Sequence, residues 1–139
     1  MRIGTDIVEI ERIKQAVERN PRFVQKILTA SELTRFNSLG EARALEFLAG
    51  RFCAKEAYLK ALGTGIGRIR LVDVEISAGP NGAPYIAQAP IRDNVQVSIS
   101  HCRQFATAMV LIELTDDDIN AKLNQLFYEK EEKRDDTSK

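Results

Sequence analysis

The pattern of apolar and polar residues divides the chain into a helical first half and a strand-rich second half. A short apolar run opens the chain and predicts a strand that ends near Asp6. Apolar residues at helical spacing follow, from Ile10 through Ile13 to Val17, and predict a first helix. Asn20 and the proline after it should end that helix, because this dipeptide favours a turn.

Two more helices are expected before the strands begin. The segment Thr29-Ala-Ser-Glu32 has the residue pattern of a capping box and predicts a short helix that runs towards Leu39. A longer helix should extend from about Glu41 to Leu62 and end at Gly63, which is a typical C-terminal cap.

Alternating segments in the second half predict consecutive strands at residues 72–76, around Tyr85, at 95–101 and at 105–114. The tail should form an amphipathic helix that gives way to a charged end; its apolar positions are Ile119, Leu123, Leu126 and Phe127. Because helices come first and strands follow, the fold class is α+β, with N-terminal helices packed on a largely antiparallel sheet.

Composition limits the classes of protein that remain. The chain has 139 residues, of which 44% are hydrophobic and 29% charged, as expected for one globular domain. No apolar run approaches the ~20 residues that a membrane-spanning helix needs, so no membrane association is expected. Cys53 and Cys102 form no C-x-x-C pair, and no signal peptide is recognisable. We therefore expect a cytoplasmic protein.

Charge is distributed unevenly although the net charge is zero. Residues 115–139 contain eight acidic and five basic residues, which leaves this tail at −3 and the rest of the chain at +3. Basic residues gather early in the chain: Arg12, Lys14, Arg19, Arg22 and Lys26. Nucleic-acid binding usually requires a larger excess of positive charge and stacking aromatic residues, and this chain has no Trp. A small acidic protein is the favoured partner, and a solvated helix face is the alternative.

Glu56 stands out in the long predicted helix. The helix has a core-facing stripe at three- and four-residue steps, formed by Leu45, Leu48, Ala49, Phe52, Leu59 and Leu62. At 100° per residue, Glu56 falls within this stripe. A desolvated carboxylate needs a positive partner. Two interpretations stand: a structural pair with Lys60 one turn later, or a metal ion held by Glu56 and a second carboxylate.

Asp6 is the natural second carboxylate. Asp is disfavoured in strands, yet Asp6 stands among strand-forming residues. The alternative is structural, because Asp6-Ile-Val-Glu9 also fits a capping box for the first helix. Two carboxylates suit Mg²⁺, which commonly binds one or two of them together with water and substrate phosphates. They do not suit zinc, which prefers His and Cys.

Two further features are ambiguous when taken alone. His101, the single histidine, continues the inward alternation of its strand, so it is either a core residue or a polar group at a strand end that reaches a ligand. Glycines at 63, 65 and 67 follow the helix cations Arg51, Lys55 and Lys60. Such a loop can cradle phosphate, but a plain C-cap loop explains it as well, and its spacing matches neither the P-loop nor the dinucleotide fingerprint.

Taken together, these residues resemble the holo-acyl-carrier-protein synthase family of phosphopantetheinyl transferases. The resemblance runs from Met1 to about Leu114. It is carried by Gly4-Thr-Asp6-Ile-Val, by Ile27-Leu-Thr-Ala-Ser-Glu32-Leu, by the block from Glu46 to Gly67 with Arg51-Phe-Cys-Ala-Lys55-Glu56-Ala-Tyr-Leu-Lys60-Ala at its centre, by Asn81-Gly-Ala-Pro84 and by Val97-Ser-Ile-Ser-His101. The central block, preceded by the Gly-x-Asp motif, is highly specific and favours the functional interpretations of Asp6 and His101.

The resemblance implies a 4′-phosphopantetheinyl transferase-like fold for residues 1–114 and leaves 115–139 as a charged, partly helical extension. It implies transfer of the 4′-phosphopantetheine arm of CoA to a serine of apo-acyl carrier protein, with 3′,5′-ADP as the other product, in support of fatty acid biosynthesis. Asp6 and Glu56 match the Mg²⁺ ligands, and Lys60 matches the lysine near the transferred phosphate. Either a metal-bound water or Glu56 would take the serine proton.

The resemblance also assigns binding residues and an assembly. Arg51, Lys60, Gly63, Ser100 and His101 match positions of the CoA site. Arg12 and Arg22 match basic positions that dock the acidic carrier, and no nucleic acid is involved. Family members of this type are homotrimers with active sites between subunits. The alternatives from other classes are a Mg²⁺-dependent phosphohydrolase that uses the same carboxylates and a carrier-binding module without catalysis.

The tail lies outside the resemblance. We expect it either to pack on the trimer or to compete weakly, through its acidic residues, with the carrier for the basic patch. Truncation after Leu114 with no change in assembly or in carrier KM would count against both expectations.

Overall fold

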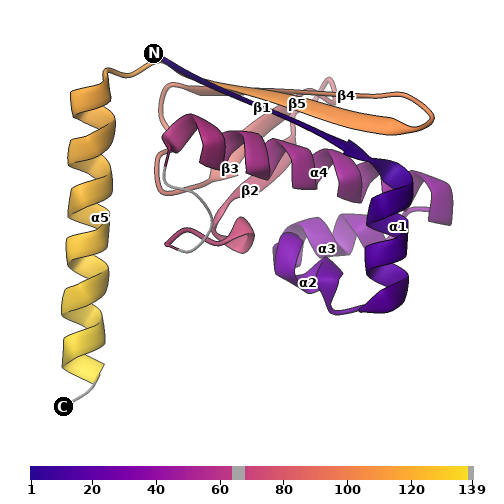
Figure 1. Cartoon of the computed structure of the whole chain (residues 1–139), viewed down its shortest axis with the longest axis horizontal. Coiled ribbons are helices and arrows are strands. Elements are labelled where there is room, and N and C mark those ends of the chain that lie inside the picture. Colours follow the sequence, from indigo (N-terminus) through magenta and orange to yellow (C-terminus); the bar gives the residue numbers. More distant parts are fainter. Residues whose placement is uncertain (64–67, 138–139) are drawn as a thin grey trace.

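The central unit is a three-stranded antiparallel sheet with a long helix packed across one face (Figure 1). The computed structural model describes residues 1–63 and 68–137. The strand order is β1-β5-β4, and the long helix is α4. The strands and this helix have the bounds Arg2–Glu9 (β1), Val95–His101 (β4), Phe105–Ile112 (β5) and Glu41–Leu62 (α4). This arrangement confirms the predicted α+β class with an antiparallel sheet.

β1 pairs with β5 along its whole length, from Arg2 opposite Ile112 to Glu9 opposite Phe105. The strand is therefore longer than predicted, and Asp6 lies within it rather than at its end. Since side chains alternate between the faces of a strand, Asp6 points to the face that α4 covers, whereas its neighbours in sequence point to the outer face.

Three short helices cluster beside α4: α1 (Ile10–Arg19), α2 (Phe23–Ile27) and α3 (Ala30–Asn37). The predicted break at Asn20 is confirmed, since this residue caps the C-terminal end of α1. The predicted capping box is also confirmed. The Glu32 backbone N–H donates to Thr29 Oγ1 at 3.3 Å, and the Thr29 backbone N–H donates to Glu32 Oε1 at 2.8 Å.

α4 begins and ends where the sequence predicts, and Gly63 caps it with a left-handed φ of 76°. Leu48, Ala49, Leu59 and Leu62 are buried as expected, although Leu45 and Phe52 are only partly buried. The buried surface of α4 is much wider than a single stripe, because the three-stranded sheet covers one side and the short helices pack on others.

The strand predicted at residues 72–76 is wrong in its first half. Leu71–Asp73 forms a short 3-10 helix (η1), and β2 (Glu75–Ala78) follows it and pairs with β3 (Pro84–Gln88) in a separate two-stranded sheet. The reason is local: the Asp73 carboxylate accepts hydrogen bonds from the backbone N–H and the guanidinium of Arg70, at 2.8 and 3.0 Å, which stabilises a turn of helix there.

α5 (Asp116–Thr137) continues through the charged end of the chain, further than predicted. It packs on the body through the buried residues Ile119 and Leu123, and Phe127 and Lys130 contact Arg68. The end of the helix, residues 131–137, is exposed and extends away from the body (Figure 1). Arg2 fastens the start of this helix, because its guanidinium donates to Asp116 at 2.8 Å and to the Leu62 carbonyl at 2.6 Å. Within the described ranges, no helix has the length and apolar character to span a bilayer.

Candidate functional site

Gly4 determines how closely β1 approaches α4. A Cβ on this residue would lie 1.9 Å from the carbonyl oxygen of Ala57 and 2.7 Å from the backbone nitrogen of Ala61, distances that no side chain can occupy. The strand backbone therefore lies directly against the helix. This contact brings Asp6, two residues further along β1, next to the acidic and basic side chains of α4.

Asp6 and Lys60 form an ion pair across this contact, with 3.0 Å between Nζ and Oδ1. The ammonium group also donates to the carbonyl oxygen of Thr5 at 3.0 Å. The Asp6 side chain is 16% exposed and that of Lys60 is 56% exposed, so the pair lies at the edge of solvent. Lys60 thus pairs with Asp6 rather than with Glu56, the partner considered in the structural interpretation of the sequence.

Glu56 is half-buried beside this pair. Burial raises the pKa of its carboxyl group, the negative charge of Asp6 raises it further, and Lys60 acts in the opposite direction. Two carboxylates thus lie close together in a partly desolvated place, with one exposed lysine to balance them. The capping box considered for Asp6 and Glu9 does not form, because Glu9 is the N-cap of α1 and makes no side-chain cap hydrogen bond.

The donor set at Asp6 and Glu56 fits a hard divalent cation. Both groups present carboxylate oxygens, which Mg²⁺ prefers, and Mg²⁺ needs only one or two of them when water and substrate phosphates supply the rest. In the described part of the chain, no cluster of three or more His, Cys, Asp or Glu side chains offers a complete protein cage for a metal. A site with two carboxylates leaves most coordination positions open to substrate.

Cys53 lies in the core against the same carboxylates. Its Sγ donates to the Ala106 carbonyl at 3.3 Å. Burial and then the charge of Asp6 raise the pKa of this thiol to about 12. The thiol therefore stays neutral near pH 7, adds no charge to the site and is no nucleophile.

A second feature is a small cavity of about 100 Å³ between α3, α4 and β4. Arg51 and His101 both line it, as do Arg35, Arg43 and Glu46, and the last two form an ion pair at 3.4 Å. The guanidinium of Arg51 lies 4.5 Å from the centre of the Phe47 ring, and its buried Nε has no hydrogen-bond partner among the described residues. Burial lowers the pKa of Arg51, whereas the negative charge of Glu32 raises it. The guanidinium nevertheless remains charged near pH 7. The cavity suits an anionic group.

Arg35 and Arg43 were not among the residues predicted from the sequence. Arg43 stands two helical turns before Arg51, so helical spacing could have placed both on one side of α4. Arg35 belongs to α3, and only the packing of α3 beside α4 brings it to the cavity. His101 is exposed at the end of β4, which excludes the interpretation as a core histidine.

The other predicted residues lie elsewhere. Ser100 is exposed on the outer face of the sheet, opposite Thr107, so within one chain it does not join the cavity of His101. Arg12 and Arg22 are exposed on α1 and directly before α2. Lys55, which the sequence groups with the phosphate-facing cations, is fully buried and paired with Glu32. The glycines at 65 and 67 lie outside the described residues.

These features define a class of protein chemistry. A pair of carboxylates with a lysine can hold a divalent cation against a phosphate group, and a basic cavity can bind an anionic group. Such an arrangement is typical of metal-assisted transfer of a phosphorus group, in which positioning and charge neutralisation do most of the work.

The comparisons with known proteins agree with this class. The family model described as the 4′-phosphopantetheinyl transferase superfamily matches residues 2–110, and the chain belongs to this family. The chain is 51% identical over 112 residues to holo-[acyl-carrier-protein] synthase of Anoxybacillus flavithermus, which covers 80% of this chain and 93% of that protein. The corresponding protein of Enterococcus faecalis is 49% identical over 111 residues, with 80% and 95% covered.

Solved structures show the same fold. The crystal structure of a holo-(acyl-carrier-protein) synthase from Bacillus anthracis in complex with CoA (3′,5′-ADP) superposes with a TM-score of 0.75 at 40% identity, over 82% of this chain and 96% of that one. The Helicobacter pylori synthase in complex with coenzyme A gives a TM-score of 0.69 at 34% identity, with 80% and 99% covered. The predicted 4′-phosphopantetheinyl transferase-like fold is therefore confirmed.

Proposed function

We propose that this chain transfers the 4′-phosphopantetheine arm of CoA to a serine of apo-acyl carrier protein, yielding holo-acyl carrier protein and 3′,5′-ADP, in support of fatty acid biosynthesis. The cluster of Asp6, Glu56 and Lys60, in a chain that belongs to the transferase superfamily, is the observation that carries the proposal. The serine oxygen forms a bond to the β-phosphorus of CoA, and the bond from this phosphorus to the bridging oxygen breaks. The serine proton goes to a base, and the leaving oxygen stays with 3′,5′-ADP.

Asp6 and Glu56 would hold Mg²⁺, which supplies charge neutralisation at the pyrophosphate. Lys60 stands beside Asp6 with its ammonium group partly exposed, so it can bind a pyrophosphate oxygen and stabilise charge on the leaving side. Glu56 is a candidate acceptor for the serine proton, because its raised pKa brings the carboxylate closer to the pH at which it would act as a base.

The basic cavity would bind a second anionic group of CoA. CoA carries a 3′-phosphate in addition to its pyrophosphate, and Arg51, His101, Arg35 and Arg43 provide positive or hydrogen-bonding groups around one small space. The buried Arg51 Nε has no partner among the described residues, and a buried N–H group normally has one, so a ligand in this cavity is a candidate partner. Gly63 and Ser100 stay predictions for the same substrate.

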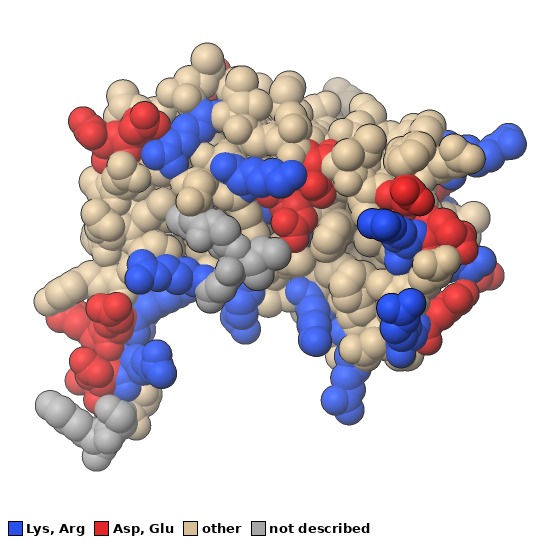
Figure 2. Space-filling view, viewed as in Figure 1, with Lys and Arg blue, Asp and Glu red and all other residues tan. Residues whose placement is uncertain are grey.

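Carrier docking is proposed for the surface of α1 and the start of α2. Arg12 and Arg22 are exposed there and make no ion pair among the described contacts. Figure 2 shows basic side chains projecting from the lower part of the body, on the side of the short helices. An acidic carrier would be attracted by such a surface, mainly through faster association.

A homotrimer with active sites between subunits is part of the proposal. The outer face of the sheet is not covered by any described element, and it exposes large apolar side chains: Ile3 (58%), Ile7 (65%), Phe105 (38%) and Met109 (49%). A contiguous apolar face of this kind is typical of a protein interface. Ser100 lies on this face, so assembly could bring it to the site of another subunit.

Residues 1–114 would form the transferase domain and 115–139 an extension, and a cytoplasmic location stays a prediction. The decisive experiment is intact-protein mass spectrometry of apo-acyl carrier protein incubated with CoA and this protein, with Mg²⁺ or with EDTA. The expected result is a mass gain of one phosphopantetheine arm that EDTA abolishes. An unmodified carrier with cleaved CoA would indicate a hydrolase, and an unmodified carrier with intact CoA would indicate a binding module.

A further inference from the structure

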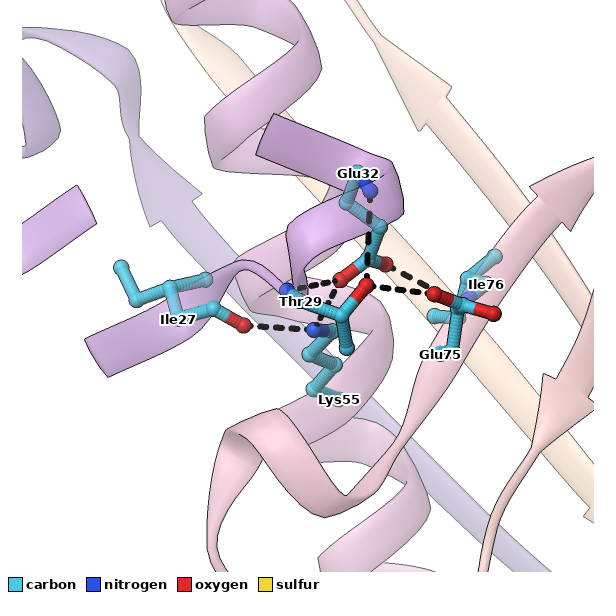
Figure 3. A network of polar contacts seen from close by, with 6 residues as sticks. All are labelled: Ile27, Thr29, Glu32, Lys55, Glu75 and Ile76. Atoms are coloured by element: carbon cyan, nitrogen blue, oxygen red, sulfur yellow. Dashed lines mark hydrogen bonds and ion pairs between the residues drawn. The ribbon is translucent and has the colours of Figure 1, made fainter. Parts of the chain in front are cut away.

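A second ion pair, between Glu32 and Lys55, is buried within the molecule (Figure 3). Lys55 directly precedes Glu56 in the sequence. The two side chains are 2% and 0% exposed, and Lys55 Nζ lies 2.5 Å from Glu32 Oε1. Neither group can reach substrate from this position. A buried ion pair adds little net stability compared with apolar residues of the same size, so its contribution has to be sought in the geometry that it imposes.

The pair joins four elements at one point. Lys55 Nζ, from α4, also donates to the carbonyl oxygen of Ile27, the last residue of α2. The Glu32 carboxylate accepts from the backbone N–H of Thr29 at 2.8 Å, at the start of α3, and from that of Ile76 at 3.0 Å, in β2. Thr29 Oγ1 in turn donates to Glu75 at 2.6 Å.

The charges of the pair complement the ends of the two short helices. The ammonium group lies at the C-terminal end of α2 and the carboxylate at the N-terminal end of α3, where opposite partial charges are exposed. α2 has only five residues, too few for a helix to be stable by itself. Its position therefore depends on Lys55 and on the burial of Val24 and Ile27.

The residue that this anchor places is Arg22, directly before α2, which is exposed and belongs to the proposed docking surface. We propose that the Glu32–Lys55 pair is a positioning device for the carrier: it holds α2, and with it Arg22, in register with the catalytic helix α4. This inference rests on the proposed function. It predicts that loss of the pair weakens binding of the acidic carrier more than binding of CoA, although Glu32 also caps α3, which carries Arg35 of the basic cavity.

The test compares the double variant Glu32→Gln, Lys55→Met with the parent, and both partners are changed so that no buried charge is left alone. We expect carrier KM to rise about tenfold, as for loss of one well-placed charged contact, with a clearly smaller rise in CoA KM. The dissociation constant for fluorescently labelled apo-carrier should weaken in parallel. In Lys55→Met alone, Glu32 keeps its two backbone N–H donors. This variant should also raise carrier KM more than CoA KM.

Tyr58→Phe is the matched control. Tyr58 is also fully buried on α4, and its hydroxyl bonds both the N–H and the carbonyl of Ile91 at 2.9 Å, away from α2. This variant should lose stability without a change in carrier KM. A parallel change of both KM values, unchanged carrier affinity, the same effect in Tyr58→Phe, or failure of both Lys55 variants to fold would each overturn the inference.

The experiment separates this inference from the proposed function. If the parent binds the carrier but transfers nothing, the proposed function fails, and the dissociation constants of the variants still decide the positioning role. If the parent does not bind the carrier at all, the positioning role is overturned as well.

Discussion

The ammonium group of Lys60 lies 3.0 Å from Oδ1 of Asp6, and this pair joins the first strand to the long helix. Burial raises the pKa of Glu56, Asp6 raises it further, and Lys60 acts in the opposite direction. The lysine thus balances part of the charge of two carboxylates. A substrate that carries a pyrophosphate and a divalent cation would meet negative and positive groups already side by side, which lessens the rearrangement needed for binding.

Loss of either carboxylate should remove activity without unfolding the protein. We expect Asp6→Asn and Glu56→Gln to lower transfer to the carrier by more than about 100-fold at saturating Mg²⁺, because ligand changes at metal sites have effects at least this large. Circular dichroism should show an unchanged fold. Glu131→Gln, a change at an exposed carboxylate of α5 outside the site, is the control. Near-normal turnover in either site variant would contradict the assignment.

The raised pKa of Glu56 predicts a dependence of stability on pH in metal-free protein. A carboxyl group whose pKa is higher in the folded chain than in the unfolded chain stabilises the fold when protonated, and this contribution is lost as pH rises through the folded pKa. Glu56→Gln should therefore unfold at a higher temperature than the parent near pH 8, and the difference should shrink towards about pH 4, where an ordinary carboxyl group is protonated.

The measurement is thermal unfolding of both proteins in EDTA across this pH range. Addition of Mg²⁺ should then stabilise the parent more than the variant, because binding to the folded state raises its stability. A parent more stable than the variant in EDTA at every pH would show that ionised Glu56 is not strained in the folded protein.

Gly4→Ala should be strongly destabilising. The new methyl group would clash with the backbone of α4, which cannot move as a flexible side chain can, so the cost should reach or exceed the ~1–3 kcal/mol typical of overpacking. Chemical denaturation checks this value. Gly79→Ala is the control, because the added Cβ would lie 3.6 Å from the nearest atom, an ordinary contact. Equal stability of the two variants would contradict the close approach of β1 to α4.

The exposed face of the sheet predicts self-association. Ile7→Glu would place a charge in the centre of the proposed interface, so light scattering should give three times the chain mass for the parent and a lower mass for the variant. Tyr128→Glu, a change at an exposed aromatic residue of α5, should leave the mass unchanged. A monomeric parent would refute the trimer.

The two halves of α5 should respond differently to truncation. Removal of residues 131–139, of which the described residues 131–137 are exposed, should leave the unfolding temperature nearly unchanged. Truncation after Leu114 should lower it, because buried Ile119 and Leu123 are lost and each large apolar side chain contributes about 1.5–3 kcal/mol. Carrier KM and assembly, measured on the same two proteins, test the expected roles of the tail. If neither carrier KM nor assembly changes, both packing of the tail on the trimer and its competition with the carrier are excluded.

The sequence predicts best those features that depend on neighbouring residues. The capping box at Thr29 and the end of α4 at Gly63 are local, so residue type alone indicates them. The predicted end of β1 near Asp6 is wrong, because the strand is extended by pairing with β5, about a hundred residues later in the sequence. The turn at Leu71–Asp73 was missed because alternation of apolar residues concealed the hydrogen bonds between Asp73 and Arg70.

The candidate site follows the same division. Asp6, Glu56 and Lys60 were all predicted, yet the pairing of Lys60 with Asp6 depends on how close a glycine lets the strand approach the helix. Arg35 reaches its cavity only through the packing of α3. Lys55 resembles a surface cation in the sequence, and its burial against Glu32 requires three other elements to converge on it.

The contact between the two ends of the body has a practical consequence for anyone who produces this protein. The Met1 ammonium group donates to the Leu114 carbonyl at 2.8 Å, and Arg2, the next residue, secures both α4 and α5. An affinity tag fused before Met1 would remove that terminal charge and crowd the start of α5. The far end of α5, at Thr137, lies away from the body (Figure 1), so the C-terminal side is the better place for a tag, a fluorophore or surface immobilisation.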